Sequence, residues 1–416
     1  MKSFYFILLS ICITTCLHAQ SIGLPQLEAA FLQQNSLLLA SKYNIDQADA
    51  DIVQSKLWNN PTLSISEFNL WKTSHVEEQG FLFGSYGKSQ QFAVDLEQLI
   101  ETAGKRRKRV AVKELEKNQA LFEYEELLRQ LKKELRQHYY ALAYLDAQCA
   151  HLNSAIDLFT QMLDQYGRQA DLKNIAKADF FRVQTELMAL QKERIELQAQ
   201  QIDELSKLKL LTQNSELTIA ALDFSLFHEF DKRIPLTIKS LAKAQNIGLK
   251  QQENEINLAR QQWVLEKAQK VPDLRFQVNY DRGGNIMRDF VGVGISVDLP
   301  VFNTNKGNIK ASELVIQKQQ STQNAVLFEL ETTVDRLQNQ FNQIEHSMQA
   351  WRNLNPAAFT SMLENYQKHL QNKQITLLEF IDFTQAYRQS QQALLEMQLA
   401  YHQTFEELTY IVGQDF

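Results

Sequence analysis

The chain has 416 residues, with only 13 glycines and 6 prolines, 44% hydrophobic residues and a formal net charge of −6. So few helix-breaking residues are typical of long helices, and they exclude a collagen-like chain, a disordered protein and a disulfide-rich secreted module. The negative net charge excludes a nucleic-acid partner, because phosphate binding requires a basic surface.

Residues 1–19 have the pattern of a secretory signal peptide. Lys2 precedes an apolar run from Phe4 to Leu17, and Ala19 provides a small residue at the cleavage position. A buried N-terminal helix and a lipidated Cys16 are the alternatives. Of the three cysteines, only Cys149 remains after cleavage, so the mature chain cannot form an internal disulfide.

Two alternating segments, at about residues 61–71 and 90–99, predict the first pair of β-strands. Nine to eleven alternating residues match the length of a tilted strand that crosses a bilayer, whereas two soluble hairpins are the alternative. Four aromatic residues near the ends of this hairpin suit an interfacial girdle, with a loop core as the competing interpretation. They are Trp71, Phe81, Phe83 and Tyr86.

Five consecutive bases follow, from Lys105 to Arg109. Positive charges at the start of a helix oppose its macrodipole, so another interaction should favour them. We expect anionic lipid headgroups or a protein partner in this role, and an ordinary exposed basic turn is the alternative.

Two long helices are predicted at about 105–166 and 171–213, because almost no glycine or proline occurs there. Apolar residues recur at alternating spacings of three and four through 121–166, a heptad pattern typical of a left-handed coiled coil. His138 interrupts this pattern and is interpreted as a hydrogen-bonded seam residue and not as a metal ligand. Gly167 predicts the turn between the two helices.

The second half of the chain has the same plan. Strands are predicted at about 272–281 and 290–300, and helices at about 306–368 and 374–412. Gly104 corresponds to Gly307 at an offset of 203, and Phe180 corresponds to Phe380 at an offset of 200. The chain is therefore predicted to be a tandem repeat, with halves at 20–230 and 231–416.

The four predicted strands are too few to close a membrane barrel, which needs about eight. Open strand edges are not tolerated in lipid, so several copies must share one barrel. Three copies would give a twelve-stranded barrel with their helices stacked as a tube. The predicted fold class is therefore mainly α, with a contribution to a membrane β-barrel.

This layout resembles the outer-membrane efflux channel family, the TolC-like exit ducts of tripartite pumps. The resemblance covers nearly the whole mature chain and rests on four segments. They are Val271 to Leu274 (VPDL), Val293 to Asn308 (VGISVDLPVFNTNKGN), Thr102 to Arg106 (TAGKR) and Ile375 to Thr384 (ITLLEFIDFT). It implies a homotrimer with an α-helical periplasmic tunnel, and it places Gly104, Lys105, Arg106 and Gly307 at the barrel–periplasm junction. The segment DLPVFNTNKGN is most similar to the branch that serves heavy-metal cation pumps.

The resemblance also implies that Glu379 and Asp382 line the periplasmic constriction of the pore. Their spacing puts both carboxylates on one helix face, and three copies would bring them into one ring that favours cations. A solvated acidic face is the alternative. The first hairpin keeps an acid at Asp179, but Arg182 replaces the second one, so only the second hairpin is expected to carry the ring.

The predicted function is a passive exit duct in the outer membrane of a Gram-negative bacterium, with the helices in the periplasm. The resemblance implies a periplasmic adaptor (membrane fusion protein), an inner-membrane RND-type pump and outer-membrane lipid as partners. The substrate is predicted to be heavy-metal cations, with drug or other small-molecule efflux as one alternative and a periplasmic coiled-coil structural protein as another. The chain lacks the usual nucleotide-binding, hydrolase and metalloprotease motifs, so no enzymatic activity, cofactor or dedicated metal site is expected.

Overall fold

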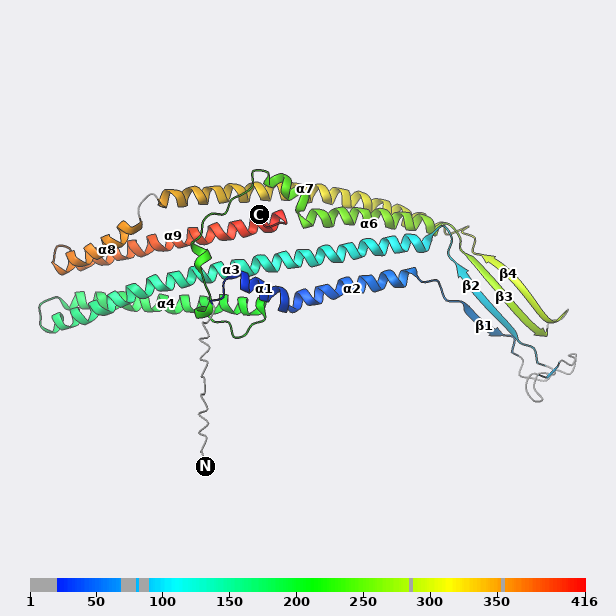
Figure 1. Cartoon of the computed structure of the whole chain (residues 1–416), viewed down its shortest axis with the longest axis horizontal. Coiled ribbons are helices and arrows are strands. Elements are labelled where there is room, and N and C mark those ends of the chain that lie inside the picture. The colour runs from blue at the N-terminus through cyan, green and yellow to red at the C-terminus, as the bar shows by residue number, and fades with distance from the viewer. Residues whose placement is uncertain (1–20, 69–79, 82–89, 284–286, 353–355) are drawn as a thin grey trace, which may run out of the picture. The chain divides into compact units, whose positions relative to one another are not determined.

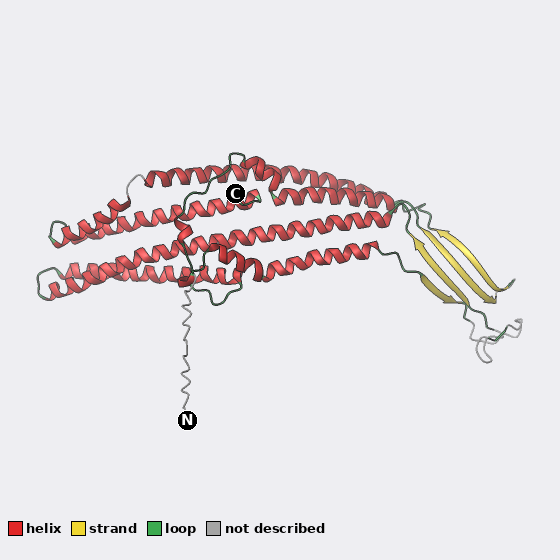
Figure 2. Ribbon diagram, in the orientation of Figure 1, coloured by secondary structure: helices red, strands yellow, loops and turns green. Residues whose placement is uncertain are grey.

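The computed structural model describes residues 21–68, 80–81, 90–283, 287–352 and 356–416. The predicted signal peptide and three of the predicted girdle residues, Trp71, Phe83 and Tyr86, lie outside these ranges. The described elements are mostly helices, with the strands confined to one sheet (Figures 1 and 2). None of the helices in these ranges has a stretch long and apolar enough to cross a membrane.

The chain divides into two compact units, and each unit contains segments from both repeats. The sheet unit consists of Ala40–Leu127 and Lys243–Glu331. The hairpin unit consists of the described residues up to Leu39, Leu128–Ala242 and Thr332–Phe416. Each unit is described separately below.

The sheet unit carries one antiparallel sheet in the order β1-β2-β3-β4. Its strands are β1 (Thr62–Ser66), β2 (Ala93–Ile100), β3 (Leu274–Gly283) and β4 (Arg288–Val297). The central pair, β2 and β3, joins the two repeats, with Leu96 opposite Val278. Strands β1 and β4 are consequently the edges of the sheet, and each presents a row of backbone groups without a neighbouring strand.

Four long helices belong wholly or partly to the sheet unit, and the short α5 (Ile238–Gln245) reaches into it. Helices α2 (Ser36–Lys56) and α6 (Ile247–Gln269) precede β1 and β3, and α3 (Lys105–Asp171) and α7 (Lys306–Arg352) follow β2 and β4. Polar contacts join neighbouring helices, because Lys117 Nζ lies 2.7 Å from Asp49 Oδ1 and Gln252 donates to the Gln319 carbonyl at 3.0 Å.

The hairpin unit is formed by the parts of α3 and α7 beyond the sheet unit together with α4 (Lys177–Thr212), α8 (Pro356–Gln371) and α9 (Leu377–Val412). The short helices α1 (Leu24–Gln34), η1 (Ile219–Ala221), η2 (Ser225–His228) and α5 (Ile238–Gln245) complete the elements of the chain that the structure describes. The predicted heptad residues of α3 supply the core, including Leu145, Leu152 and Phe159, which are buried in one cluster with residues of α4 and α9 such as Leu190 and Phe380.

The prediction that Gly167 ends the first long helix is wrong. Helix α3 continues through Gly167 to Asp171, and α4 begins only at Lys177. A Cβ atom at position 167 would lie 3.4 Å from the ring of Phe180, so this glycine allows close packing between the two helices. The turn is made by Lys173, which adopts a left-handed conformation with φ 59°.

The helix predicted at 306–368 is described in two parts, α7 to Arg352 and α8 from Pro356. Residues 353–355 between them lie outside the described ranges. Helix α9 begins three residues later than predicted, after a turn in which Lys373 has φ 57°.

Candidate functional site

The sheet has one apolar and one polar face, because side chains alternate along each strand and the register aligns them across all four. Leu63, Leu96, Val278 and Val293 form one row across the sheet. Their exposed fractions are 64%, 45%, 48% and 86%. An apolar row that no part of its own chain covers is typical of a surface that contacts lipid or another protein.

Charged and amide side chains pair on the opposite face. The Glu97 carboxylate lies 2.8 Å from Arg275 Nη1 and accepts a hydrogen bond of 2.7 Å from Gln277. A second carboxylate, Asp298, lies 3.4 Å from Arg275 Nη2. The two faces therefore differ as the lipid and lumen sides of a membrane strand differ.

Lys105 ties the start of α3 to the start of β3. Its side chain is only 4% exposed, and its Nζ lies 2.8 Å from Asp273 Oδ2. The backbone N–H of Thr102 donates to the other oxygen of Asp273 at 2.8 Å. Gly104 lies between them with φ +67°, a conformation that favours glycine. The sequence prediction did not assign a role to Asp273, although it lies within the VPDL segment that was singled out.

Three of the other four bases of the 105–109 run also have contacts within the chain. Arg109 pairs with Glu101, and Lys108 Nζ donates to the Ala103 carbonyl at 2.9 Å. The guanidinium of Arg106 lies 4.1 Å from the centre of the Trp58 ring. These contacts offset the unfavourable interaction with the helix macrodipole.

The second repeat uses different chemistry at the corresponding junction. Asn305, which has φ 54°, donates through Nδ2 to the Glu266 carbonyl at 2.9 Å and to Glu266 Oε2 at 2.7 Å. Gly307 is the second residue of α7 and follows this contact directly. The structure therefore brings Gly104, Lys105 and Arg106 together at the first junction and places Gly307 at the second.

Glu379 belongs to a capping box at the start of α9. Its Oε2 accepts a hydrogen bond of 2.7 Å from the backbone N–H of Thr376, and the Thr376 hydroxyl accepts one of 3.2 Å from the Glu379 N–H. The hydrogen bond from the Thr376 backbone is the main reason why the pKa of Glu379 is lowered. Asp382 follows on the exposed surface of the same helix.

The corresponding turn of the first repeat has the same backbone without this cap. Ala176 occupies the N-cap position of α4 and offers no side-chain hydrogen bond, and Asp179 is the acidic residue of the first turn. The carboxylate of Glu379 therefore has two possible uses, helix capping and pore lining, whereas Asp382 takes no part in the cap.

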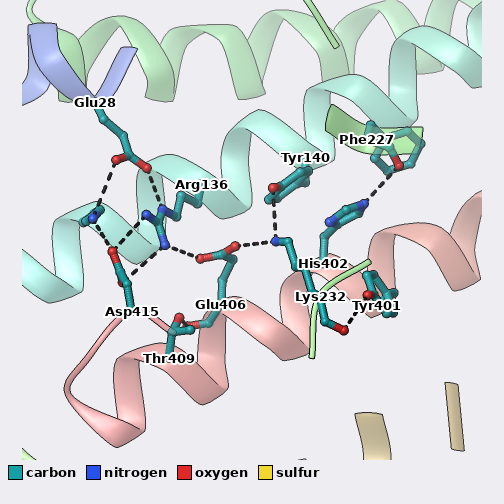
Figure 3. A network of polar contacts seen from close by, with 11 residues as sticks. Glu28, Arg136, Tyr140, Phe227, Lys232, Tyr401, His402, Glu406, Thr409 and Asp415 are labelled. Carbon is teal, nitrogen blue, oxygen red and sulfur yellow. Dashed lines mark hydrogen bonds and ion pairs between the residues drawn. The ribbon is translucent and has the colours of Figure 1, made fainter. Parts of the chain in front are cut away.

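A buried cluster of charges in the hairpin unit joins segments that are far apart in the sequence (Figure 3). The Glu406 side chain is 3% exposed and lies between two cations, 2.8 Å from Arg136 Nη1 and 2.7 Å from Lys232 Nζ. Arg136 Nε also lies 2.6 Å from Glu28 Oε1, and its Nη2 lies 3.2 Å from Asp415 Oδ2. The cluster thus connects α1, α3, the segment between the repeats and the C-terminal end of the chain.

Burial and neighbouring charges shift the pKa values in this cluster. Burial disfavours the charged Arg136 guanidinium, but Glu406, Glu28 and Asp415 outweigh it and raise the pKa. Burial lowers the pKa of Lys232 although Glu406 favours the ammonium form.

His402 is fully buried beside this cluster and is neutral. Its ring is stacked on Tyr140 at 4.1 Å, and its Nε2 lies 3.0 Å from the Phe227 carbonyl, so Nε2 carries the proton. Burial, together with the nearby Lys232, lowers the pKa of His402 to about 3.

Helix α4 exposes four apolar residues that are each seven positions apart. Phe181, Met188, Ile195 and Ile202 have exposed fractions between 59% and 66%. A seven-residue spacing keeps them on one face of the helix. This α4 stripe is, like the apolar face of the sheet, a surface that the described part of the chain leaves uncovered.

Within the ranges that the structure describes, no group of three or more His, Cys, Asp and Glu side chains is placed to hold a metal ion. His138 Nδ1 lies 2.7 Å from Glu204 Oε2, which satisfies it as a seam residue of the helices. Cys149 is buried in the core, and burial raises the pKa of its thiol.

Comparison with known proteins identifies the family. Residues 28–213 and 238–414 both match the family described as outer membrane efflux protein, which confirms the tandem repeat and the resemblance deduced from the sequence. No curated protein sequence matches the chain.

Solved structures share the fold over nearly the whole chain. The outer-membrane channel OprN is 13% identical with a TM-score of 0.78, and the match covers 94% of this chain and 90% of that chain. CusC is 13% identical with a TM-score of 0.74, covering 94% and 92%. The open-state MtrE channel of Neisseria gonorrhoeae is 14% identical with a TM-score of 0.74, covering 94% and 89%. At these identities the likeness establishes the fold and does not transfer a substrate.

Proposed function

Because the chain belongs to the outer membrane efflux protein family, we propose that it is the exit channel of a tripartite efflux pump. Three copies associate, and their sheets close into one twelve-stranded barrel in the outer membrane while their helices form a periplasmic tunnel. The channel is passive, and the energy for transport comes from an inner-membrane RND-type pump that a periplasmic adaptor connects to it.

The observation that carries this proposal is the sheet, with its open edges and its uncovered apolar face. In a lipid environment the free backbone groups of β1 and β4 would be too costly, so β4 of one copy must pair with β1 of the next. The α4 stripe supports association in the same way, because a second copy would cover it. A periplasmic coiled-coil structural protein would leave both surfaces unexplained.

Extraction and mass measurement test the assembly. We expect the protein to require detergent for release from membranes, to have the mass of three chains by native mass spectrometry, and to conduct ions in planar bilayers. Release as a monomer by salt or urea, without conductance, would overturn the proposal in favour of the structural alternative.

We propose further that Glu379 and Asp382 line the periplasmic constriction and favour cations. Both are exposed near the start of α9, and three copies would bring six carboxylates into one ring. Asp382 gives the clearer test, because Glu379 also belongs to the capping box and its substitution would weaken the helix start.

Reversal potentials under a salt gradient measure this selectivity. Asp382→Asn should lower the preference of the channel for cations while leaving its stability unchanged. The matched control is Thr376→Ala, which removes the cap but no charge and should leave the selectivity unchanged. Equal cation selectivity in the wild type and Asp382→Asn would assign the acids to an ordinary solvated face.

Heavy-metal cations are the proposed substrate, on the basis of the DLPVFNTNKGN segment and its similarity to the cation-pump branch. A growth panel on a deletion strain tests this with salts of copper, silver, zinc, cobalt and cadmium beside bile salts, dyes and antibiotics. Sensitivity to metals alone would support the proposal. Sensitivity to organic compounds alone would replace the metal substrate with drugs and keep the channel.

A further inference from the structure

We propose that Trp58, Arg106 and Arg107 form a binding site for the phosphate headgroup of an anionic phospholipid. This inference rests on the proposed function, because it requires the sheet to lie in the outer membrane. The site is located where the first repeat passes from strands to helices, so the lipid would belong to the periplasmic leaflet.

A cavity of about 130 Å³ lies at this place. It is lined by Trp58, Asn59, Glu101, Gly104, Arg106 and Arg107. This volume is well below the several hundred Å³ of a pocket for a drug-sized molecule. It therefore suits the phosphate of a headgroup, and the acyl chains of the lipid would remain outside.

The two arginines are placed on this cavity by different contacts. The Arg106 guanidinium stacks at 4.1 Å on the Trp58 ring and donates to the Lys56 carbonyl at 3.4 Å, so its position is fixed by α2 and the residues after it. Arg107 folds back over the turn, since its Nη2 lies 4.0 Å from where a Cβ of Gly104 would be. Two guanidinium groups around a small space suit phosphate, which they bind through paired hydrogen bonds.

The charge balance favours an anion although Glu101 also lines the cavity. The Glu101 carboxylate pairs with Arg109, and the nearby Asp273 carboxylate pairs with the buried Lys105. Each acid of the junction is thus matched by a base outside the proposed site. The positive charges of Arg106 and Arg107 are left for a ligand.

Exposed apolar residues beside the cavity indicate a lipid and not free phosphate. Leu57 and Trp58 are 55% and 61% exposed. Exposed apolar residues also follow β4 in the second repeat, where Val301 is 69% exposed and the Phe302 side chain is fully exposed. Aromatic residues next to bases are typical of the membrane–water interface, where the ring contacts the acyl chains and the base contacts the phosphate.

Native mass spectrometry of the detergent-solubilised assembly tests the site with phosphatidylglycerol and phosphatidylcholine as probes. We expect wild type to retain phosphatidylglycerol in preference to phosphatidylcholine. In the double variant Arg106→Gln/Arg107→Gln, the phosphatidylglycerol concentration for half-occupancy should rise about tenfold or more. The matched control, Lys192→Gln/Lys310→Gln, also removes two positive charges, each paired with a glutamate of its own helix, and should bind like wild type.

Two outcomes would overturn the proposed lipid site. If the control and the double variant lost phosphatidylglycerol equally, the effect would be one of net charge and not of this site. Displacement of the bound lipid by millimolar inorganic phosphate would show that the site binds free phosphate and would likewise overturn the lipid assignment.

Trp58 fluorescence provides a second measurement that does not depend on the arginine variants. In liposomes, brominated phosphatidylglycerol should quench the wild type more strongly than Trp58→Phe. Equal quenching in a protein that inserts and conducts would contradict this inference alone. A protein that neither inserts nor conducts would contradict the proposed channel itself, so the two failures can be told apart.

Discussion

Helices α4 and α9 are corresponding elements of the two repeats, but α9 also buries positions that α4 leaves exposed. Both have 36 residues, and both end at a residue in the left-handed conformation, Gln213 and Gly413. The exposed residues Ile195 and Ile202 of α4 correspond to Leu395 and His402 of α9, which are buried. The duplicated backbone is thus retained, while α9 covers within the chain two positions of the face that α4 leaves exposed.

In the proposed trimer, this difference would give a duplicated chain one direction of assembly. If both helices were covered, the protomer would lose the α4 stripe as a contact surface for a neighbour. If both were exposed, α4 and α9 could exchange roles and neighbouring copies could associate in more than one way. Charges at the C-terminal part of α9, above all Glu406, hold that helix against its own chain. The following predictions test this contrast.

Removal of the Glu406 charge should have the largest effect. Glu406→Gln leaves Arg136 and Lys232 buried without their shared counter-ion, and breaking a buried ion pair costs about 3 kcal/mol or more. Denaturant unfolding measures the change in the free energy of unfolding. The control is Ser206→Ala at the corresponding position of α4, where the side chain is exposed and the change should stay within about 0.5 kcal/mol. Equal effects in the two variants would mean that the helices are not differently held.

Substitution of the α4 stripe should abolish association without unfolding the protomer. Ile195→Asp/Ile202→Asp puts charges on the face that a neighbouring copy would cover, and each lost apolar contact is worth about 2 kcal/mol. Native mass spectrometry should detect single chains, while circular dichroism remains helical. Gln200→Asp, an exposed site on the same helix away from the stripe, should still assemble. A stable trimer of the double variant would show that α4 does not lie at the interface.

Acid should destabilise the surroundings of His402. The pKa of His402 is lowered to about 3 in the folded protein, whereas it is near 6.5 in the unfolded chain. The neutral ring therefore makes its full contribution to the free energy of unfolding only above about pH 6.5. The contribution falls with decreasing pH from that value down to about 3, by roughly 1.4 kcal/mol per pH unit. We expect the unfolding midpoint of the wild type to fall more steeply between pH 6.5 and 4.5 than that of His402→Gln. Parallel curves would assign the acid sensitivity to groups other than His402.

The helix caps should give the smallest effect. Thr376→Ala removes the capping box of α9 and should cost about 1 kcal/mol, whereas Ala176→Thr should stabilise α4 by roughly 0.5–1 kcal/mol because Asp179 already stands in its first turn. The pKa of Glu379 is lowered in the folded protein. The stabilisation by the capping box is therefore present at neutral pH and is lost as the pH falls through this lowered pKa. Thermal unfolding measures both variants, and a gain from Thr376→Ala would contradict the assigned role.

The parts of the fold that depend on local periodicity could be predicted from the sequence. Strict alternation identified β3 and β4, and heptad spacing identified core residues such as Leu142 and Phe159. The end of α3 could not be predicted, because the tolerance of Gly167 depends on the ring of Phe180 on another helix. Only the three-dimensional fold brings Arg136, Lys232 and Glu406 together, since they are separated by 96 to 270 residues along the chain.

For the candidate site too, some residues could be predicted from the sequence, whereas their partners required the structure. Lys105 and Arg106 were recognised as a conspicuous basic run, but their partners Asp273 and Trp58 lie far away in the sequence or in another element. The acid pair of α9 was singled out through the family resemblance, whereas the capping role of Glu379 required the backbone geometry at Thr376.

The two edge strands differ in length, since β1 has 5 residues and β4 has 10. In a ring of copies, the joint between β4 and β1 can therefore be no longer than the five residues of β1, which makes it as short as the β1–β2 joint and shorter than the β2–β3 and β3–β4 joints. Under force or heat such a ring should part on one side of β1 or the other, while β2, β3 and β4 stay paired. The resistance of the barrel to breakage is then set by its shortest strand.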